Sequence, residues 1–292
     1  MDQLQLETEA CLAASVERAS AGPCPPLLAQ ALQYAVFPGG ARVRPSLCLA
    51  VAHANLGHAP PLACAAATAI ELLHCASLVH DDMPCFDNAA TRRGKPALHT
   101  VYGEPLALLV GDALIVAAFD GMALAALETG DAAACAALTA IVARGVGSPA
   151  GIVAGQAWES EQQVDVSAYH RAKTGALFVA ATSAGAAAAG VDYLPWQALG
   201  ERIGEAYQVA DDIQDVMAPA ADLDKPTGQD AALGRPSIVA ERGLDGAVAY
   251  LKQLVEAGRD AVPDCPGRAS LHALLEQQSR RFLPRGLGQR AA

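Results

Sequence analysis

Residues 73–96 read LHCASLVHDDMPCFDNAATRRGKP, an apolar helical run that ends in a cluster of acidic and basic side chains. Asp81 and Asp82 close the run, Asp87 follows six residues after Asp81, and Arg92 and Arg93 come next. Carboxylates this close suit a bound cation, and Mg²⁺ accepts one or two of them together with water and substrate phosphates. The arginines offer forked donors to phosphate oxygens. The stretch therefore favours a metal–diphosphate site over the alternative, an acidic helix end with surface salt bridges.

A second acidic stretch, residues 206–230, reads AYQVADDIQDVMAPAADLDKPTGQD and strengthens this interpretation. Asp211 and Asp215 are four residues apart, so they share one face of a helix. Gln208 lies three residues before Asp211 and joins the same face. Candidate cations for this second motif are Lys173, Lys225 and Arg235.

The composition predicts an all-α chain without a linker that would divide it, so residues 1–292 are expected to form a single domain. Hydrophobic residues make up 52% and aromatic residues only 4%, because alanine dominates. Alanine is the best helix former, and its small side chain allows close helix packing. The net charge of −11 makes nucleic acid and anionic membrane surfaces poor partners.

The cysteines and the apolar runs predict a cytoplasmic protein without a transmembrane segment. The eight cysteines form no CxxC pair, which favours reduced thiols over a zinc site or a disulfide framework. Residues 1–10, MDQLQLETEA, are too polar for a secretory signal. The apolar run from Ala176 to Val191 is shorter than the roughly 20 residues that a membrane span needs.

Helical periodicity runs through nearly the whole chain, and convincing alternating strands are absent. One long helix is expected from Pro60-Pro61 to the first acidic motif. A third helix opens within residues 41–45 and runs to Asn55 or Gly57. The other expected helices cover residues 2–20, 26–36, 104–127, 131–144, 149–163, 195–217, 237–258 and 267–281.

Two further segments could bind phosphate, and each has a plain structural alternative. Gly39-Gly40, followed by Arg42 and Arg44 at a helix start, is either an anion site or a turn with exposed arginines. Lys173 and Thr174 precede an alanine-rich helix, where they either hold phosphate or mark a helix break with a solvated lysine.

His74 lies two helical turns before Asp81, on the same face of the expected helix. A histidine in this position is either a packed core residue or a group that faces the ligand. The sequence alone leaves both interpretations open.

Together these motifs resemble the trans-isoprenyl diphosphate synthases, and the resemblance covers nearly the whole chain. The residues from Asp81 to Asp87 match the family's DDxxxxD motif, and those from Asp211 to Asp215 match DDxxD. The RRGKP segment and the intervening Lys173-Thr174 complete the set. The pattern is most similar to the geranylgeranyl diphosphate synthases of bacterial carotenoid and chlorophyll pathways.

The resemblance implies an all-α isoprenoid synthase fold of roughly a dozen helices around a deep central cavity, usually a homodimer. It implies Mg²⁺, with Mn²⁺ as a substitute, and head-to-tail condensation of isopentenyl diphosphate with an allylic diphosphate to geranylgeranyl diphosphate. The metal positions are Asp81, Asp82, Asp87, Asp211, Asp212 and Asp215. Residues that match the allylic substrate positions are Arg92, Lys173, Thr174, Gln208 and Lys225, and those for isopentenyl diphosphate are Arg44, His74 and Arg93.

Three positions depart from the family pattern. Ala41 stands where GGKRxRP has lysine, so one isopentenyl diphosphate contact is missing unless Arg42 or the basic C-terminal residues replace it. Arg235 stands where lysine is common, which keeps the charge of a substrate-binding position but changes its geometry. Glu159 stands where the family's GQxxD segment, here beginning Gly155-Gln156, has aspartate.

Ala76 lies five residues before Asp81, where farnesyl-producing bacterial members often carry a bulky aromatic residue. Ala76 and Ser77 are small, so the product is expected to pass the farnesyl stage and reach C20. A farnesyl or longer-chain synthase is the first alternative. A class I terpene cyclase, which typically lacks a second DDxxD motif, and a regulatory subunit with degraded acidic motifs are the others.

Overall fold

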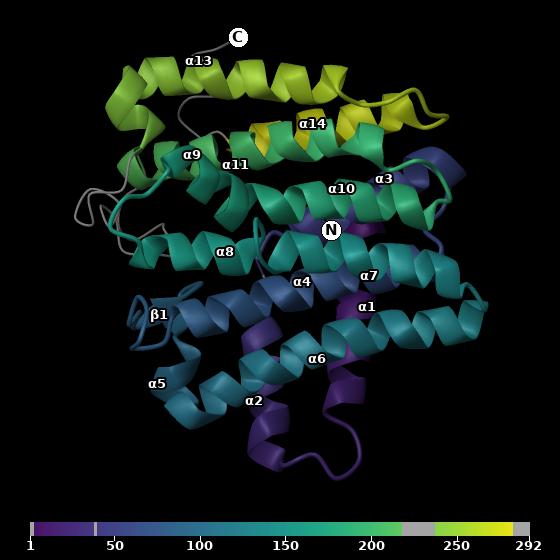
Figure 1. The fold of residues 1–292 in the computed structure, drawn as a ribbon, viewed down its shortest axis with the longest axis vertical. Coiled ribbons are helices and arrows are strands. Elements are labelled where there is room, and N and C mark those ends of the chain that lie inside the picture. The colour runs from purple at the N-terminus through teal and green to yellow at the C-terminus, as the bar shows by residue number, and fades with distance from the viewer. Residues whose placement is uncertain (1–2, 38–39, 218–236, 283–292) are drawn as a thin grey trace.

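The computed structural model describes residues 3–37, 40–217 and 237–282. The described part of the chain belongs to the all-α class, as predicted, and contains only one short two-stranded hairpin besides its helices (Figure 1). Its long helices are α1 (Gln3–Ala19), α2 (Pro26–Val36), α3 (Val43–Leu56), α4 (Pro61–Asp81), α6 (Glu104–Thr129), α7 (Ala132–Val146), α10 (Ala176–Ala188), α11 (Gln197–Met217), α13 (Ile238–Asp260) and α14 (Arg268–Phe282). Short helices are α5 (Leu98–Tyr102), α8 (Ile152–Ala157) and α9 (Val166–His170).

Helix α4 lies inside the bundle and carries the first acidic motif at its carboxyl end. Pro61 occupies its first turn, where a missing N–H costs nothing. Alanines and leucines then bury almost every side of the helix against its neighbours, including α6, α3 and α10. The sequence LHCASLVHD therefore folds as a core helix whose last turn delivers Asp81 to one end of the bundle.

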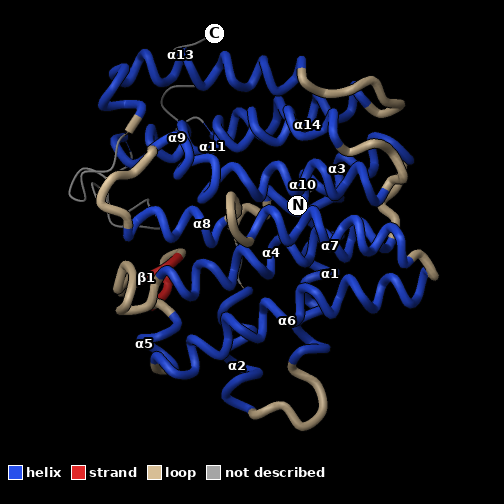
Figure 2. Tube along the Cα trace, in the orientation of Figure 1, coloured by secondary structure: helices blue, strands red, loops and turns tan. Residues whose placement is uncertain are grey.

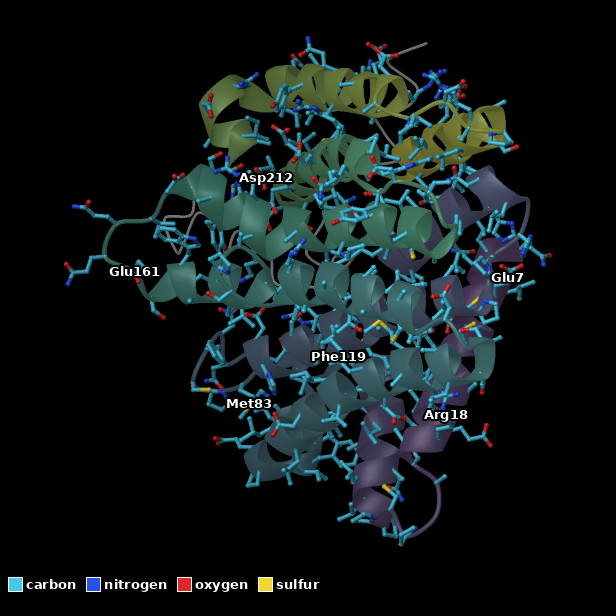
Figure 3. All side chains as sticks on the ribbon, turned by 45° about the vertical axis from the view of Figure 1, so that its right-hand side comes forward. Glu7, Arg18, Met83, Phe119, Glu161 and Asp212 are labelled. Atoms are coloured by element: carbon cyan, nitrogen blue, oxygen red, sulfur yellow. The ribbon has the colours of Figure 1, made fainter. Side chains whose placement is uncertain are left out.

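The ends of α4, α8, α9 and α11 gather on the same side of the molecule (Figures 1 and 2). Figure 3 shows Met83, which follows α4, and Asp212 on α11 at this end, while Glu7 lies at the opposite end. Segments that are more than a hundred residues apart in the sequence are thus brought to one end of the helices.

A small hairpin after α4 was not expected from the sequence. Strand β1 (Thr91–Arg92) pairs antiparallel with β2 (Lys95–Pro96). Arg93 and Gly94 form its two-residue turn with φ of 53° and 70°. Positive φ at both positions is the geometry that favours two-residue hairpins. The short strands have no alternating pattern, so only the turn residues could have indicated them.

One expected helix and the segment around Lys173 differ in detail. The segment expected as one helix over 149–163 is α8 followed by a 3₁₀ turn, Trp158–Ser160. Lys173 and Thr174 lie within a π-helical stretch, Arg171–Gly175, that joins α9 to α10, and so they do not precede a helix break. The wider π turn is a common feature of functional sites.

Helices α4 and α6 are long and apolar enough to cross a membrane by length and composition alone. Both are longer than the apolar run from Ala176 to Val191, on whose length the expectation of no transmembrane segment was based. In α4, 72% of the most apolar window is buried within the chain, as in a core helix. In α6 the buried share is only 33%, so this helix leaves an apolar face outside the core.

Candidate active site

A cavity of about 540 Å³ opens at the end of the bundle where α4, α8 and α11 meet. Its lining includes residues from both acidic motifs and most of the predicted cations. The predicted residues that line it are Arg44, His74, Ser77, Asp81, Asp87, Arg92, Arg93, Lys173, Thr174, Gln208, Asp211 and Asp215. Both phosphate-binding segments suggested by the sequence therefore reach one cavity.

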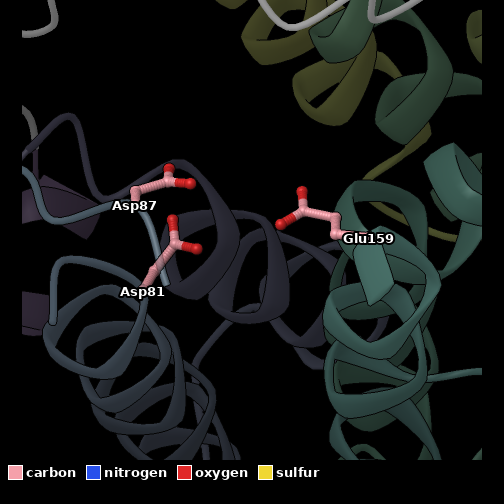
Figure 4. Close-up of side chains that lie close together, drawn as sticks. All are labelled: Asp81, Asp87 and Glu159. Atoms are coloured by element: carbon pink, nitrogen blue, oxygen red, sulfur yellow. The ribbon is translucent and has the colours of Figure 1, made fainter. Parts of the chain in front are cut away.

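Asp81 and Asp87 line this cavity, and the Glu159 carboxylate points towards them from the opposite side (Figure 4). Oxygen atoms of the three carboxylates all lie within 4.8 Å of one another. The loop after α4 folds back so that the Asp87 N–H donates to the Asp81 carbonyl at 3.0 Å. Three carboxylates at this spacing fit a divalent cation with hard oxygen ligands. Glu159 was noted in the sequence but not predicted to be part of the site.

Asp82 contacts Arg92 rather than the open cavity. The Arg92 Nε donates to Asp82 Oδ1 at 2.9 Å and to Oδ2 at 3.2 Å. The Asp82 side chain is only 4% exposed, and burial raises the pKa of its carboxyl although Arg92 acts to lower it. Arg92 Nη2 also lies 3.6 Å from Asp81 Oδ2. Asp82 thus holds Arg92 beside the carboxylate cluster.

Lys173 is paired with Glu159 across the gap between α8 and the π-helical stretch. Its Nζ lies 2.5 Å from Glu159 Oε1 and 3.7 Å from Asp81 Oδ1. Glu159 also accepts hydrogen bonds from the Tyr169 hydroxyl at 2.6 Å and from Gln156 Nε2 at 2.9 Å. Gln156 Nε2 donates to Asp81 Oδ1 as well, at 2.8 Å. One network therefore joins α4, α8, α9 and the π-helical stretch.

The second acidic motif lies on α11 with its members on different faces. Asp211 and Asp215 line the cavity, as their four-residue spacing predicts. Asp212 is 4% exposed and accepts hydrogen bonds from Gln208 Nε2 at 2.9 Å and from the Ile238 N–H at 2.8 Å. Gln208 in turn accepts from the Thr174 hydroxyl at 2.8 Å. Asp212 therefore connects α11 to α13 and orients Gln208.

A second group of cations lies around Arg44 on α3. Arg44 is 9% exposed, and its guanidinium carbon lies 4.6 Å from the Phe178 ring centroid and 5.3 Å from that of Tyr207. Among the described residues, its Nε has no hydrogen-bond partner. A buried cation stacked on aromatic rings with a spare donor is suited to receive an anion from the cavity.

Arg93 completes this second cationic group, and the neutral ring of His74 lines the same cavity. Burial, followed by the charges of Arg44 and Arg93, lowers the pKa of His74 well below its ordinary value, so the ring is neutral at pH 7. The Arg93 guanidinium lies against Gly40: a β-carbon there would be 3.2 Å from Arg93 Nε. The absence of a side chain at Gly40 thus makes room for a cation at the cavity.

Arg42 is held by protein groups and is not poised to replace the missing lysine at Ala41. Its Nε donates to Glu9 at 2.9 Å, and Nη1 and Nη2 donate to Glu71 and the Val36 carbonyl, both at 2.7 Å. Burial acts to lower its pKa, but the ion pairs with Glu71 and Glu9 more than offset this and raise it. Arg42 therefore ties α1 and α4 together beside the cavity.

Some predicted residues do not reach the cavity or lie outside the description. Asp82 and Asp212 are buried behind it, and Ala76 is 2% exposed within the hydrophobic core. Lys225 and Arg235 lie outside the described residues. Sequence reasoning missed Tyr169 and the pairing of Glu159 with Lys173, because only the GQxxD spacing pointed towards Glu159.

The comparisons with known proteins agree with this geometry. A family model described as polyprenyl synthetase matches residues 25–265. The chain is 51% identical over 276 residues to a geranylgeranyl diphosphate synthase of Cereibacter sphaeroides, covering 94% of this chain and 95% of the relative. It is 46% identical over 280 residues to one of Rhodobacter capsulatus, covering 96% of each.

Among solved structures, a Helicobacter pylori geranyltransferase complexed with magnesium and isoprenyl diphosphate matches with a TM-score of 0.78. Its identity to this chain is 28%, and the match covers 96% of this chain and 99% of that one. The family model spans both acidic motifs and the cationic residues between them. The chain belongs to the polyprenyl synthetase family.

Proposed function

We propose that this protein is a geranylgeranyl diphosphate synthase that condenses isopentenyl diphosphate with dimethylallyl, geranyl and farnesyl diphosphates. The observation that carries the proposal is one cavity lined by acidic groups of both motifs and by two separate sets of cations. Two sets of cations suit two diphosphates held at the same time. The relatives with 51% and 46% identity carry this enzyme's name.

The carboxylates fit the Mg²⁺ that the family implies, with Mn²⁺ as a substitute. Asp81, Asp87 and Glu159 offer oxygens within 4.8 Å of one another, and Asp211 and Asp215 line the same cavity. Bound there, the metal supplies positive charge that neutralises the substrate diphosphate. Asp82 and Asp212 are proposed to support the two motifs through Arg92 and Gln208, in addition to their predicted metal role.

The chain's own cations act on the allylic diphosphate as it leaves. Arg92, Lys173 and the Thr174–Gln208 pair line the side of the cavity that carries the first motif and the π-helical stretch. Their positive charge and hydrogen bonds stabilise the negative charge that develops when the C–O bond breaks. For Lys173, release from Glu159 would accompany substrate binding. Lys225 and Arg235, predicted for the same diphosphate, remain predictions.

Arg44, Arg93 and the neutral His74 would hold isopentenyl diphosphate so that its double bond faces the allylic carbon. The double bond attacks the allylic cation, and loss of a proton to the released diphosphate completes one five-carbon extension. Water would react with the allylic cation and end the reaction. The apolar part of the cavity wall, which includes Leu78 and Ile152, serves to exclude water.

An assay with labelled isopentenyl diphosphate and each allylic starter tests the proposal, with products separated by chain length. A C20 product that requires Mg²⁺ or Mn²⁺ is expected. A main product of C15 or longer than C20 would assign the chain to another synthase of the same family. A cyclic hydrocarbon formed without isopentenyl diphosphate would indicate a terpene cyclase, and full activity in excess chelator would contradict the metal assignment.

A homodimer is proposed from the exposed apolar face of α6. Leu109, Val116 and Leu127 are 54%, 68% and 80% exposed. Their spacings of seven and eleven residues place them on one stripe of the helix. A second copy would cover this stripe, and light scattering measures whether the protein is dimeric. We further propose one domain in the cytoplasm, where the eight cysteines would stay free thiols.

A further inference from the structure

Tyr169 of α9 contacts both members of the ion pair between Glu159 and Lys173. Its hydroxyl donates to Glu159 Oε1 at 2.6 Å. The Lys173 Nζ lies 5.8 Å from the centroid of the tyrosine ring. A lysine ammonium within about 6 Å of an aromatic ring is attracted to its face. Tyr169 therefore holds the carboxylate with its hydroxyl and contacts the ammonium with its ring.

The start of α9 fixes the position of Tyr169. The Asp165 side chain accepts a hydrogen bond from the Ala168 N–H at 3.0 Å, and the Asp165 carbonyl accepts one from the Tyr169 N–H at 2.8 Å. The tyrosine lines the cavity, yet it is only 9% exposed. A tyrosine side chain has two rotatable dihedral angles, so ordering it costs little conformational entropy. Its hydroxyl is thus a donor held in place before any substrate binds.

The two oxygens of Glu159 have different partners. Oε1 accepts from Tyr169 and from Lys173, whereas Oε2 accepts from Gln156 Nε2 at 2.9 Å. When Lys173 turns to a diphosphate, Oε1 loses its cation but keeps the tyrosine hydroxyl. The carboxylate then stays directed at the two aspartates of the first motif, with which it forms the carboxylate cluster (Figure 4).

We propose that Tyr169 is a positioning residue that keeps Glu159 in the carboxylate cluster while Lys173 moves to the allylic diphosphate. Its hydrogen bond stabilises the negative charge on Oε1, so this oxygen does not depend on the lysine alone. Tyr169 acts through Glu159 and needs no contact with the reacting atoms. The inference rests on the proposed function, because it assigns the residue a role in binding the metal and the allylic substrate of that reaction.

Tyr169→Phe tests this role, since it removes the hydroxyl and keeps the ring beside Lys173. Mn²⁺ binding in the presence of inorganic diphosphate is measured without turnover from the electron paramagnetic resonance signal of free Mn²⁺. The Mn²⁺ concentration at half-saturation should rise about tenfold or more, as expected for the loss of a hydrogen bond to a charged group. The KM for the allylic diphosphate should rise with it, whereas the KM for isopentenyl diphosphate should stay as in the wild type.

A second tyrosine–glutamate hydrogen bond provides the matched control. The Tyr250 hydroxyl of α13 donates to Glu205 Oε1 of α11, and neither residue is among those that line the cavity. Tyr250→Phe should lower the Tm but leave Mn²⁺ binding and both KM values unchanged.

Glu159→Asp tests whether Tyr169 acts through this carboxylate. The shorter side chain withdraws the carboxylate by about 1.5 Å, the length of one C–C bond. The tyrosine hydroxyl, 2.6 Å from Oε1 in the wild type, is then out of hydrogen-bond reach. In the Glu159→Asp background, Tyr169→Phe should therefore have little further effect on Mn²⁺ binding.

Three results would overturn the proposal, provided that circular dichroism shows each variant to be folded. The first is wild-type Mn²⁺ binding and allylic KM in Tyr169→Phe. The second is an equal rise of both KM values, or the same changes in Tyr250→Phe, which would indicate a general loss of stability. The third is an undiminished effect of Tyr169→Phe in the Glu159→Asp background. If the wild type forms no prenyl product, the proposed function fails, and the Mn²⁺ titrations still decide the role of Tyr169.

Discussion

Gly155 lies directly against the backbone of Lys173, so a β-carbon at Gly155 would be 2.4 Å from the Lys173 nitrogen and 2.5 Å from its Cα. This contact brings α8 close enough to the π-helical stretch for Glu159 and Gln156 to reach Lys173 and Asp81. The glycine of the GQxxD segment is therefore needed for its small size, since its backbone φ is not in the left-handed region.

Gly155→Ala is expected to push the π-helical stretch away and to lower kcat/KM together with stability. Forcing an extra methyl into a packed contact costs about 1–3 kcal/mol. Gly175→Ala on the same stretch is the control, because its β-carbon would meet only an ordinary contact at 3.8 Å from the His170 carbonyl. Equal activity and equal Tm for both variants would contradict this account of Gly155.

Replacing Glu159 is expected to weaken the site through Lys173. Glu159→Ala removes the partner of the Lys173 ammonium and one of three clustered carboxylates, and a hydrogen bond to a charged group contributes about 1.5–3 kcal/mol. We therefore expect kcat/KM for the allylic diphosphate to fall about tenfold or more. Glu159→Asp, the residue typical of the family segment, should restore most of the loss.

The exposed Glu161, two residues further along and visible at the edge of the molecule in Figure 3, provides the matched control. Glu161→Gln should leave kcat, KM and the Mg²⁺ requirement unchanged. If Glu159→Ala retains wild-type kinetics while Lys173→Ala loses activity, Lys173 does not depend on Glu159.

Arg44→Ala is expected to raise the KM for isopentenyl diphosphate about tenfold or more, with a smaller effect on the allylic KM. The Arg44 Nε has no partner among the described residues, and a charge-assisted contact to phosphate contributes about 1.5–3 kcal/mol. Ala41→Lys should lower this KM or leave it unchanged, since Ala41 lines the same cavity. Arg171→Ala, at an exposed arginine, serves as the control and should leave the KM for isopentenyl diphosphate unchanged. If Arg44→Ala also leaves this KM unchanged, isopentenyl diphosphate does not bind at Arg44.

His74 predicts a pH dependence of stability. Its pKa is lowered in the folded chain, first by burial and then by Arg44, Arg93, Arg92 and Arg42. Below the ordinary histidine pKa of about 6.5, the unfolded chain takes up a proton that the folded chain does not. The free energy of unfolding should therefore fall as the pH drops from 7 to 5, by up to about 1.4 kcal/mol per pH unit from this group.

Urea unfolding at a series of pH values measures this slope. His74→Gln should flatten it between pH 7 and 5, whereas His58→Gln, at an exposed histidine, should leave it as in the wild type. If the unfolding free energies of the wild type and His74→Gln depend on pH in the same way, folding does not lower the pKa of His74, and this account of the histidine is wrong.

The long helices agree with the prediction, and four of the six predicted aspartates line the cavity, because both features depend on local spacing. Asp81 ends a run of helix-forming apolar residues, and Asp211 and Asp215 share a face by their four-residue separation. The pairing of Arg42 with Glu9 and Glu71 was not predicted, since it joins α1, α3 and α4. Contacts between distant segments leave no periodic signal in the chain.

The same limit explains the corrections at Lys173 and in the hairpin. The RAKTG segment has no feature that distinguishes a π-helical stretch from an ordinary helix start, so its junction with α8 through Gly155 was invisible. Arg93 adopts a positive φ that arginine rarely takes, and the contact of its guanidinium with Gly40 accompanies this conformation.

Product length depends on which of two neighbouring residues on α4 faces the growing chain. Ser77 lines the cavity, and its hydroxyl donates to the His74 carbonyl at 2.8 Å. Ala76 is 2% exposed and packs in the hydrophobic core, one residue further from Asp81. On a helix that rises about 1.5 Å per residue, these positions lie roughly 6 and 7.5 Å along the axis from Asp81. A bulky residue at either position is expected to shorten the product. At position 77 it would enter the cavity directly, whereas at position 76 it would first have to displace core side chains.

We expect Ser77→Phe to shift the main product from C20 to C15, because its ring would enter the cavity directly without displacing core side chains. Ala76→Phe should also favour C15 if the core yields and the ring turns towards the cavity. It should lower the Tm more, since overpacking a core costs about 1–3 kcal/mol. Products from labelled isopentenyl diphosphate, separated by chain length, measure the shift, and Cys135→Ser serves as a control that leaves C20 unchanged. If both bulky variants are folded and active and still make C20, the floor of the cavity is not formed by this turn of α4.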